Sequence, residues 1–404
     1  MTTRFHPTSR EAGSGAAEAA AEAAAFSLVR GDWLYRVQRR MGLIPAGGAG
    51  IGRRALFFSM LTWLPLLVWA IFNDRLFGTD GESLLGPYSV HVRCLIGIPL
   101  LIGAEAVAHR VVPLCLTQFL RSGLIDAELE PRYRAIIAGG ASLRDRAYPW
   151  VIIGGLVVAW AVAVSVSPNP DDVRWGDLGG ASGFAVWWFL LVTRPIFNVL
   201  LLAWIWRLVL ASILLFRIAS LPLRLVPTHP DRVGGLGFLS RMPFIFAPFS
   251  FAVSAVLAAA WGHEVAYHGV AIPSLYFQMG VLVLVLAVLV LVPMLTFTPR
   301  LARMRKDALL DYGALLAAHG RKVDRRWIHG EPGDADDPLL DAPELGPVAD
   351  THAIYDAVAQ TRGVLVNKGV LLAAVLPAAL PMLVLAASQL PLKATLGKLL
   401  MTLL

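Results

Sequence analysis

Five stretches of this chain contain no charged residue, and each is long enough to cross a membrane as a helix. The hydrocarbon core of a bilayer is about 30 Å thick, and a helix needs roughly 20 consecutive apolar residues to span it. Unbroken apolar runs of this length indicate membrane helices rather than half-buried strands or amphipathic helices. The stretches are residues 55–73, 149–168, 243–261, 276–299 and 369–390. We therefore predict an all-α polytopic membrane protein.

Two further apolar stretches, residues 94–115 and 184–206, are interrupted by charge. Counting both gives seven predicted spans, six within residues 55–298 and the seventh at 369–390. The composition agrees, because 57% of the 404 residues are hydrophobic and only 16% are charged, against about 25% charged in a soluble domain. The bilayer is therefore the first expected partner, and nothing in the sequence favours a nucleic acid.

The distribution of Lys and Arg sets the expected orientation. With the N-terminus inside, 28 of the 35 Lys and Arg residues fall in cytoplasmic segments, as the positive-inside rule requires. The first fifty residues lack the apolar core of a cleavable signal, so we expect the first span to act as an uncleaved anchor. The abundance of Arg and Ala suggests a bacterial source. We predict a bacterial inner-membrane protein with a cytoplasmic N-terminus and an external C-terminus.

The segments outside the spans differ in character. We expect a low-complexity tract over 1–25 that is disordered or loosely helical, a basic interfacial helix over 26–54, and an amphipathic outer-interface tail over 391–404. Residues 299–368 are predicted to form a cytoplasmic helical hairpin with an acidic, proline-rich turn. Its apolar stripe needs a partner, either the other arm of the hairpin or a neighbouring subunit. The stripe consists of Leu301, Met304, Ala308, Tyr312, Leu315, His319 and Val323.

The segment THPDRVGGLGFLS, residues 228–240, gathers turn-forming and charged residues between two spans. Its glycines fit neither a dinucleotide-binding nor a P-loop pattern, and no strand precedes it. It is either a structured turn at the membrane surface or a nest for an anion or a lipid headgroup. The residues concerned are His229, Asp231, Arg232, Gly234, Gly235 and Gly237. HPDRVGGLGFL resembles a stretch of uncharacterised bacterial multi-pass inner-membrane proteins, a likeness that implies no activity.

Signals for catalysis are weak. His263, Glu264 and His268 depart from the H-E-x-x-H pattern of zinc peptidases, because the histidines are five positions apart instead of four, which turns the second away. We expect them to lie in an ordinary exposed loop. We also find no nucleophile elbow and no Cys/His cluster, so we expect no metal and no cofactor, and an enzyme is disfavoured. Cys94 and Cys115 lie near opposite ends of one span, too far apart to form a disulfide.

Charges inside the spans are the strongest functional signal, because each is costly in the hydrocarbon core. The polar positions there are Glu105, His109, Arg110, Arg194 and Asn198. Counted from Cys94 and Phe184, Glu105 and Arg194 fall at matching depth, so we predict an ion pair between them. The pair serves either permeation or helix register. Pro195, Pro377 and Pro381 are candidate hinges.

These features favour a membrane channel or transporter for ions or small solutes, assembled as a homo-oligomer. The alternative is a non-catalytic membrane scaffold or sensor, whose cytoplasmic stalk over 299–368 binds a protein partner. A membrane-embedded enzyme comes third, because no nucleophile or metal set is present.

Overall fold

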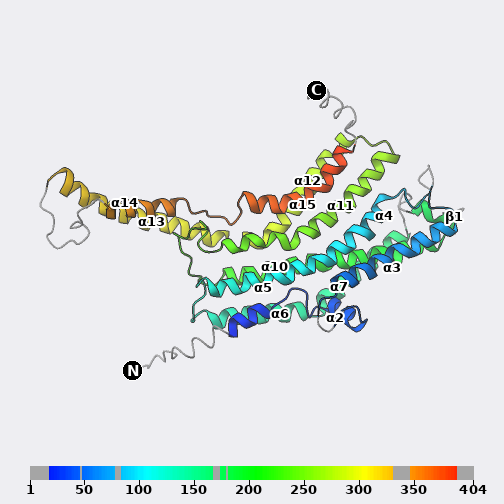
Figure 1. Cartoon of the computed structure of the whole chain (residues 1–404), viewed down its shortest axis with the longest axis horizontal. Helices are drawn as coiled ribbons and strands as arrows, with labels where there is room; N and C mark the ends of the chain where they lie inside the picture. The colour runs from blue at the N-terminus through cyan, green and yellow to red at the C-terminus, as the bar shows by residue number, and fades with distance from the viewer. Residues whose placement is uncertain are drawn as a thin grey trace, which may run out of the picture.

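The computed structural model describes residues 18–45, 48–77, 83–166, 173–178, 181–330 and 346–388. These residues are helical almost throughout, and the helices run roughly along the long axis of an elongated molecule (Figure 1). Two short strands, β1 (Asp177–Leu178) and β2 (Ala181–Ser182), pair antiparallel beside the start of span four. The prediction of an all-α fold is confirmed.

Seven helical segments of the described chain are long and apolar enough to cross a membrane, which confirms the predicted bundle. We number them as spans one to seven, and several contain more than one helical element. They are α3 (Ile51–Phe72); α4, η1 and α5 (Tyr88–Val92, Arg93–Gly97 and Ile98–Arg121); α6 and α7 (Glu130–Asp145 and Tyr148–Val166); α9, η3 and α10 (Phe184–Trp188, Phe189–Thr193 and Arg194–Ala219); η4 and α11 (Gly237–Arg241 and Pro243–Tyr267); α12 (Ile272–Leu295); and α15 (Lys368–Ala387).

Spans two and four share an interruption near their start. Each contains one turn of π-helix, η1 in span two and η3 in span four. Pro99 and Pro195 stand second in the helices that follow, α5 and α10. A proline ring clashes with the carbonyl four residues earlier, here that of Leu95 or Leu191. Both carbonyls lie inside the π turns, so we attribute the wider turns to the prolines. Span four is thus one continuous helical segment. Pro377 and Pro381 likewise lie within an unbroken α15.

Of the two alternatives for the tract over 1–25, disorder is wrong for residues 18–25, which form a helix. Its alanines pack against the bundle, with Ala19 and Ala23 fully buried. On the exposed side, Arg134 of α6 forms ion pairs with Glu22 and Glu18, at 2.7 Å and 3.2 Å. These contacts are made with a segment more than a hundred residues away along the chain, and the composition of the tract alone gives no sign of them. Residues 1–17 lie outside the described residues.

The predicted interfacial helix over 26–54 is also shorter than expected. Only α2 (Trp33–Arg40) is helical before α3 begins, because Gly31 adopts a positive φ of 99° and Asp32 caps the helix. Phe26 and Val29 are buried in the bundle rather than turned toward lipid. Trp33 remains 48% exposed. The segment therefore packs onto the protein as much as onto the membrane surface.

A helical hairpin extends beyond the bundle at one end, which we call the hairpin end (Figure 1). Its arms are α13 (Thr298–Val323), which continues into the π turn η5 (Asp324–Ile328), and α14 (Gly346–Ala359). Leu301, Ala308 and His319 of the predicted stripe are buried, and Gly313 faces the Tyr355 ring of the other arm. The stripe therefore packs within its own chain, although Leu315 is exposed. Residues 331–345 of the turn and the tail 391–404 lie outside the described residues.

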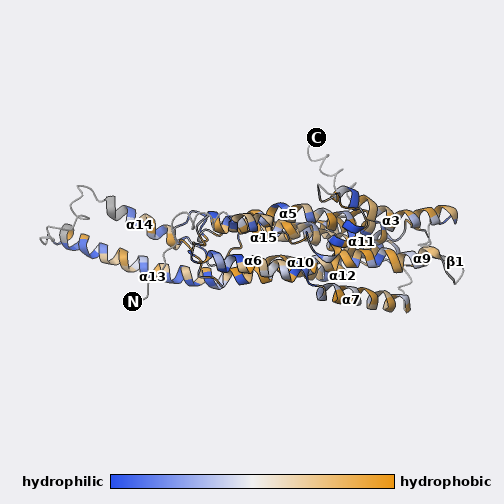
Figure 2. Ribbon diagram, turned by 90° about the horizontal axis from the view of Figure 1, so that it is seen from below, coloured by the Kyte–Doolittle hydropathy of each residue, from blue (hydrophilic) through white to orange (hydrophobic). Residues whose placement is uncertain are grey.

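Hydropathy separates the two ends of the molecule. Figure 2 shows apolar residues dominating α3, α7, α9 and α12, whereas α13 carries alternating hydrophilic and apolar residues. The main core is apolar where α5, α10 and α11 meet, and it includes Leu101, Phe197, Trp204, Phe246 and Phe249. The membrane-spanning part is therefore the half away from the hairpin.

Candidate functional site

Glu105 of α5 lies at the centre of a buried network of charges. Its carboxylate accepts a hydrogen bond from Arg54 Nη1 at 2.5 Å and forms an ion pair with Arg207 Nη2 at 3.1 Å. The three side chains are 0–2% exposed. They come from three spans, because Arg54 is in the first turn of α3 and Arg207 is in α10. Glu105 therefore joins spans one, two and four.

The network continues into the N-terminal segment. Arg207 Nη2 donates to Asp32 Oδ2 at 2.9 Å, and Arg54 Nε donates to Gln38 Oε1 at 2.5 Å. The second oxygen of Asp32 caps α2, since it accepts a hydrogen bond from the Tyr35 amide at 2.6 Å. Burial raises the pKa of the Asp32 carboxyl, and the neighbouring Arg207 guanidinium opposes that shift. The contacts that the arginines make with Asp32 and Gln38 thus fix α2 on the bundle.

His109, one turn beyond Glu105, provides a further attachment of this segment. Its Nδ1 shares a hydrogen bond of 3.0 Å with the Ser27 hydroxyl. The Ser27 oxygen also accepts hydrogen bonds from the backbone amides of Val29 and Arg30. Arg144 of α6 donates to the Ser27 carbonyl at 2.5 Å. His109 therefore positions the turn that precedes α2.

The charges of the network balance. Two carboxylates, Asp32 and Glu105, face two guanidinium groups, Arg54 and Arg207. Removing four charges from water is costly, and mutual pairing offsets that cost only when the partners remain together. The Arg207 guanidinium also lies 5.0 Å from the centre of the Trp204 ring. The arrangement is that of a closed structural cluster, and it offers no excess charge to a passing ion.

The predicted ion pair between Glu105 and Arg194 is wrong. Trp204 Nε1 donates to the Leu101 carbonyl at 2.7 Å, and this contact sets α5 against α10 in a register that brings Arg207 level with Glu105. Arg194 lies ~20 Å earlier along the helix. Part of the error arose at the start of the span. Span two begins at Tyr88, so Glu105 is ~26 Å along it, near the hairpin end of the hydrocarbon core rather than at its centre.

The other predicted polar positions do not join this network. Arg110 is exposed and Asn198 is half-buried. Sequence reasoning missed Asp32, Gln38, Arg54 and Arg207, because a charge count assigns the two arginines to solvent. One signal was present: Arg54 directly precedes the predicted span 55–73, where a charge needs either water or an acidic partner.

Arg194 belongs to a second polar group, nearer the β1 end of the molecule. Its guanidinium lies 4.9 Å from the centre of the Phe189 ring. Arg93, at the start of η1, lies over the same ring at 5.6 Å and over Phe197 at 5.5 Å. The two π turns thus bring two cations together inside the spans, where aromatic faces provide favourable electrostatic contact.

The 228–240 segment is a structured turn built around Asp231. The Asp231 carboxylate accepts hydrogen bonds from the backbone amides of Val233, Gly235 and Gly237, at 2.9, 3.1 and 2.7 Å. A Cβ on Gly237 would lie 2.9 Å from the Asp231 side chain, which explains the need for glycine. Although burial opposes the shift, these hydrogen bonds hold the pKa of Asp231 below its ordinary value. The nest considered for an external anion is filled by the chain's own carboxylate.

This turn also receives the base of the hairpin. Arg362 donates its backbone amide to the Arg232 carbonyl at 2.7 Å, and Thr361 Oγ1 donates to the Pro227 carbonyl at 2.6 Å. Arg232 itself is exposed and has a positive φ of 60°. His229 Nδ1 lies 2.8 Å from Asp231. The charged residues of the turn therefore shape a joint between the bundle and the hairpin.

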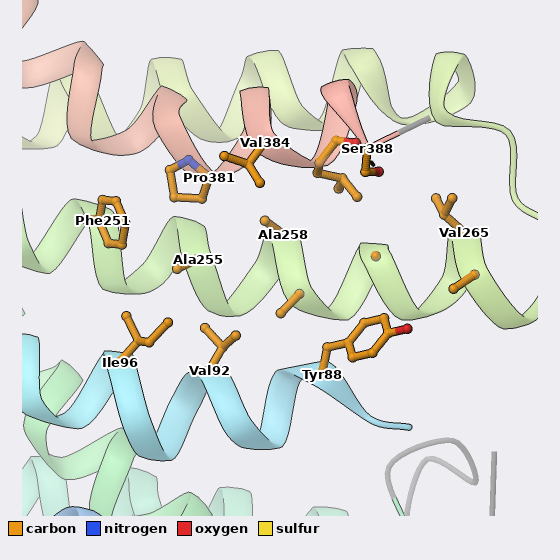
Figure 3. A pocket seen from close by; sticks show the side chains of 14 residues that line it. Tyr88, Val92, Ile96, Phe251, Ala255, Ala258, Val265, Pro381, Val384 and Ser388 are labelled. Atoms are coloured by element: carbon orange, nitrogen blue, oxygen red, sulfur yellow. Dashed lines mark hydrogen bonds between the residues drawn. The ribbon is translucent and has the colours of Figure 1, made fainter. Parts of the chain in front are cut away.

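An apolar groove runs along α11 between α4 and α15 (Figure 3). Its volume is about 550 Å³, and its lining contains no charged residue. Ala255, Ala258 and Gly262 form part of the floor, while Val92 and Pro381 stand on opposite walls. Its walls belong to spans two, five and seven, and apart from the hydroxyl groups of Tyr88 and Ser388 its side chains offer apolar contact.

The expectation that His263 lies in an exposed loop is wrong. Helix α11 continues to Tyr267, and the His263 side chain is buried. Its Nδ1 lies 3.0 Å from the Gly86 carbonyl, and its ring packs 4.6 Å from that of Tyr267. Among the described residues no group of three His, Cys, Asp or Glu side chains is arranged to hold a metal.

Comparisons of the chain with protein-family models, with curated proteins and with solved structures gave no match.

Proposed function

We propose that the chain is a non-catalytic membrane scaffold or sensor, whose helical hairpin binds a protein partner at the cytoplasmic face. The observation that carries the proposal is the hairpin itself, a helical extension held firmly at its base and free along its length (Figure 1). The bias of Lys and Arg toward this side supports a cytoplasmic location.

The contacts at the base of the hairpin would couple a movement of the bundle to a movement of the hairpin. Arg300 at the start of α13 donates to the Ala219 and Ser220 carbonyls at 3.1 and 3.0 Å, at the end of span four. Ala302 packs against Gly363 on the returning arm. Both arms are therefore anchored to the bundle, and a displacement of the spans would reach the tip.

The arms present apolar side chains that no other part of the described chain covers. Leu310 and Leu315 of α13 are 64% and 56% exposed, and Ile354 of α14 is 43% exposed. Exposed apolar groups on a charged helix are common features of protein-binding surfaces. They supply the contact energy that a partner would use.

Two measurements test this proposal. A photo-crosslinker placed at Leu310 in living cells should capture one defined protein, and Leu310→Asp with Leu315→Asp should abolish its stoichiometric copurification. Lys306→Asp, an exposed change on the same helix, should leave it intact. If the crosslinker captured only other copies of this chain, within an intact oligomer, the proposal of a different protein partner would be rejected. The surface would then serve self-assembly.

A channel or transporter for ions or small solutes, assembled as a homo-oligomer, is the second candidate. The placement of Glu105 in a balanced cluster removes one of the two charges on which that expectation rested. Arg93 and Arg194 at the paired π turns still favour it, because breaks in membrane helices commonly form solute sites. Purified protein in vesicles should then pass small anions, and Arg194→Gln should reduce the flux. If the vesicles show no flux, the channel is rejected and the scaffold or sensor remains the proposed function.

A further inference from the structure

A small polar pocket lies beside α2, outside the buried charge network. It has a volume of about 460 Å³ and is lined by Arg30, Gly31, Tyr35, Arg39 and Pro45, among others. Tyr35 and Arg39 are four residues apart on α2, so they share one face of the helix. Arg30 reaches the same pocket from the turn before the helix. Two guanidinium groups and a phenol therefore converge on one site.

The two arginines are available to a ligand. Both are exposed, and neither forms an ion pair within the described part of the chain. The nearest carboxylates are already neutralised. Asp32 turns inward to Arg207, and Asp145, which lies near Gly31, pairs with Arg144 at 2.7 Å. The pocket thus has an uncompensated positive charge, which suits an anion.

Aromatic residues place the pocket at the membrane interface. Trp33 of α2 packs against Trp150, with ring centres 6.0 Å apart, and Trp150 stands in the first turn of α7. Tyr148 is 47% exposed and packs against Trp206 at 6.4 Å. Tryptophan and tyrosine gather where the hydrocarbon meets the headgroups. Because Trp33 belongs to the same short helix as Tyr35 and Arg39, a group bound in the pocket would lie near headgroup depth.

The walls of the pocket are held in place before any ligand arrives. Asp32 is fixed by Arg207, and Gln38, on the other side of α2, is fixed by Arg54. Binding would consequently require little ordering of the backbone, which favours affinity. The buried network thus serves the pocket as a rigid support.

We propose that this pocket binds a phosphate-bearing anion, supplied by the headgroup of an anionic lipid. Guanidinium groups bind phosphate oxygens through paired, charge-assisted hydrogen bonds, and the Tyr35 hydroxyl adds a neutral donor. This site goes beyond the proposed function and does not depend on a partner of the hairpin.

Lipid retention by the purified full-length chain tests the proposal. Native mass spectrometry would compare phosphatidylglycerol with zwitterionic phosphatidylcholine, for the unmodified chain and for Arg30→Gln with Arg39→Gln. We expect this double variant to lose phosphatidylglycerol binding about tenfold or more, since it removes both charged donors from the pocket. Arg40→Gln with Arg53→Gln removes the same charge from exposed positions outside the pocket and should keep binding nearly unchanged. Tyr35→Phe, which preserves the charge, should weaken it by a smaller factor.

Two outcomes would overturn the proposal. Equal losses in both double variants would mean that general surface charge, rather than the pocket, retains the lipid. Displacement of phosphatidylglycerol from the detergent-solubilised chain by millimolar glycerol 3-phosphate or inorganic phosphate would reject the lipid and assign the site to a soluble phosphate. The proposal is supported if neither glycerol 3-phosphate nor inorganic phosphate displaces phosphatidylglycerol, and if only the Arg30→Gln, Arg39→Gln variant loses lipid binding.

Discussion

Arg54 and Arg207 would be counted as solvated cations near the ends of their spans, yet both are almost completely buried. Their stability in the bundle depends on Glu105 and Asp32, because an unpaired charge at such a position costs far more than a balanced pair. The effect of replacing one of these side chains on the free energy of unfolding therefore depends on which charges are left without a partner.

Glu105→Gln should destabilise the chain strongly, by ~3–5 kcal/mol, because Arg54 would lose its carboxylate partner and Arg207 would keep only Asp32. Adding Arg54→Gln restores the charge balance and should recover part of the loss. Arg194→Gln in the same background should recover none. The measurement is thermal unfolding in detergent, with Arg110→Gln as the exposed control on α5. Rescue by Arg194→Gln would contradict the network.

Asp231 gives a dependence on pH whose sign follows from its lowered pKa. Its ionised form stabilises the turn at pH values above about 4, the ordinary range for a free aspartate. This contribution is lost as the pH falls through the still lower pKa of the folded state. Asp231→Asn should therefore lower the melting temperature at pH 7, and the difference from the unmodified chain should shrink toward pH 3. A constant difference across that range would show that the charge is irrelevant.

At the scale of elements, the sequence predicted the spans well because an uncharged run needs no knowledge of its neighbours. It predicted contacts between spans poorly. Helix register depends on where each helix begins, and spans two and four extend well beyond the bilayer. The start at Tyr88 rather than Cys94 accounts for six of the thirteen residues between Arg194 and Arg207, and the offset of span four along span two accounts for the rest. The burial of Asp32 and Phe26 depends on contacts with distant helices, which local patterns do not reveal.

The hairpin provides a test of packing between elements. Ala308 is 5% exposed between the arms, whereas Leu315 is 56% exposed on the same helix. Ala308→Asp would bury a charge in that interface, so it should separate the arms and expose residues 298–359 to protease within minutes. Leu315→Asp should leave the cleavage rate unchanged. Limited proteolysis in detergent measures both rates, and equal protection of the two variants would mean that the arms do not depend on this contact.

At the scale of the whole molecule, seven membrane crossings would place α2, before span one, and the last turn of α15 on opposite sides of the membrane. The loop after span two and the hairpin after span six then share a side with the N-terminal segment. The structure agrees with this grouping, since α6 contacts residues 18–25 and the hairpin base contacts the turn after span four. The orientation of this set toward the cytoplasm rests on the Lys and Arg distribution.

Labelling of single cysteines measures that orientation directly. Cys94 and Cys115 are buried and would first be replaced, giving a background without cysteine. Ser274 at the start of α12 and Ser142 in α6 are both exposed, so either position should accept a cysteine without disturbing the fold. In intact cells an impermeant maleimide should label Ser274→Cys and leave Ser142→Cys unmodified. Lysis should expose Ser142→Cys to the reagent, which controls for reactivity. The reverse pattern in intact cells would place the hairpin, the phosphate pocket and the N-terminal segment outside the cell.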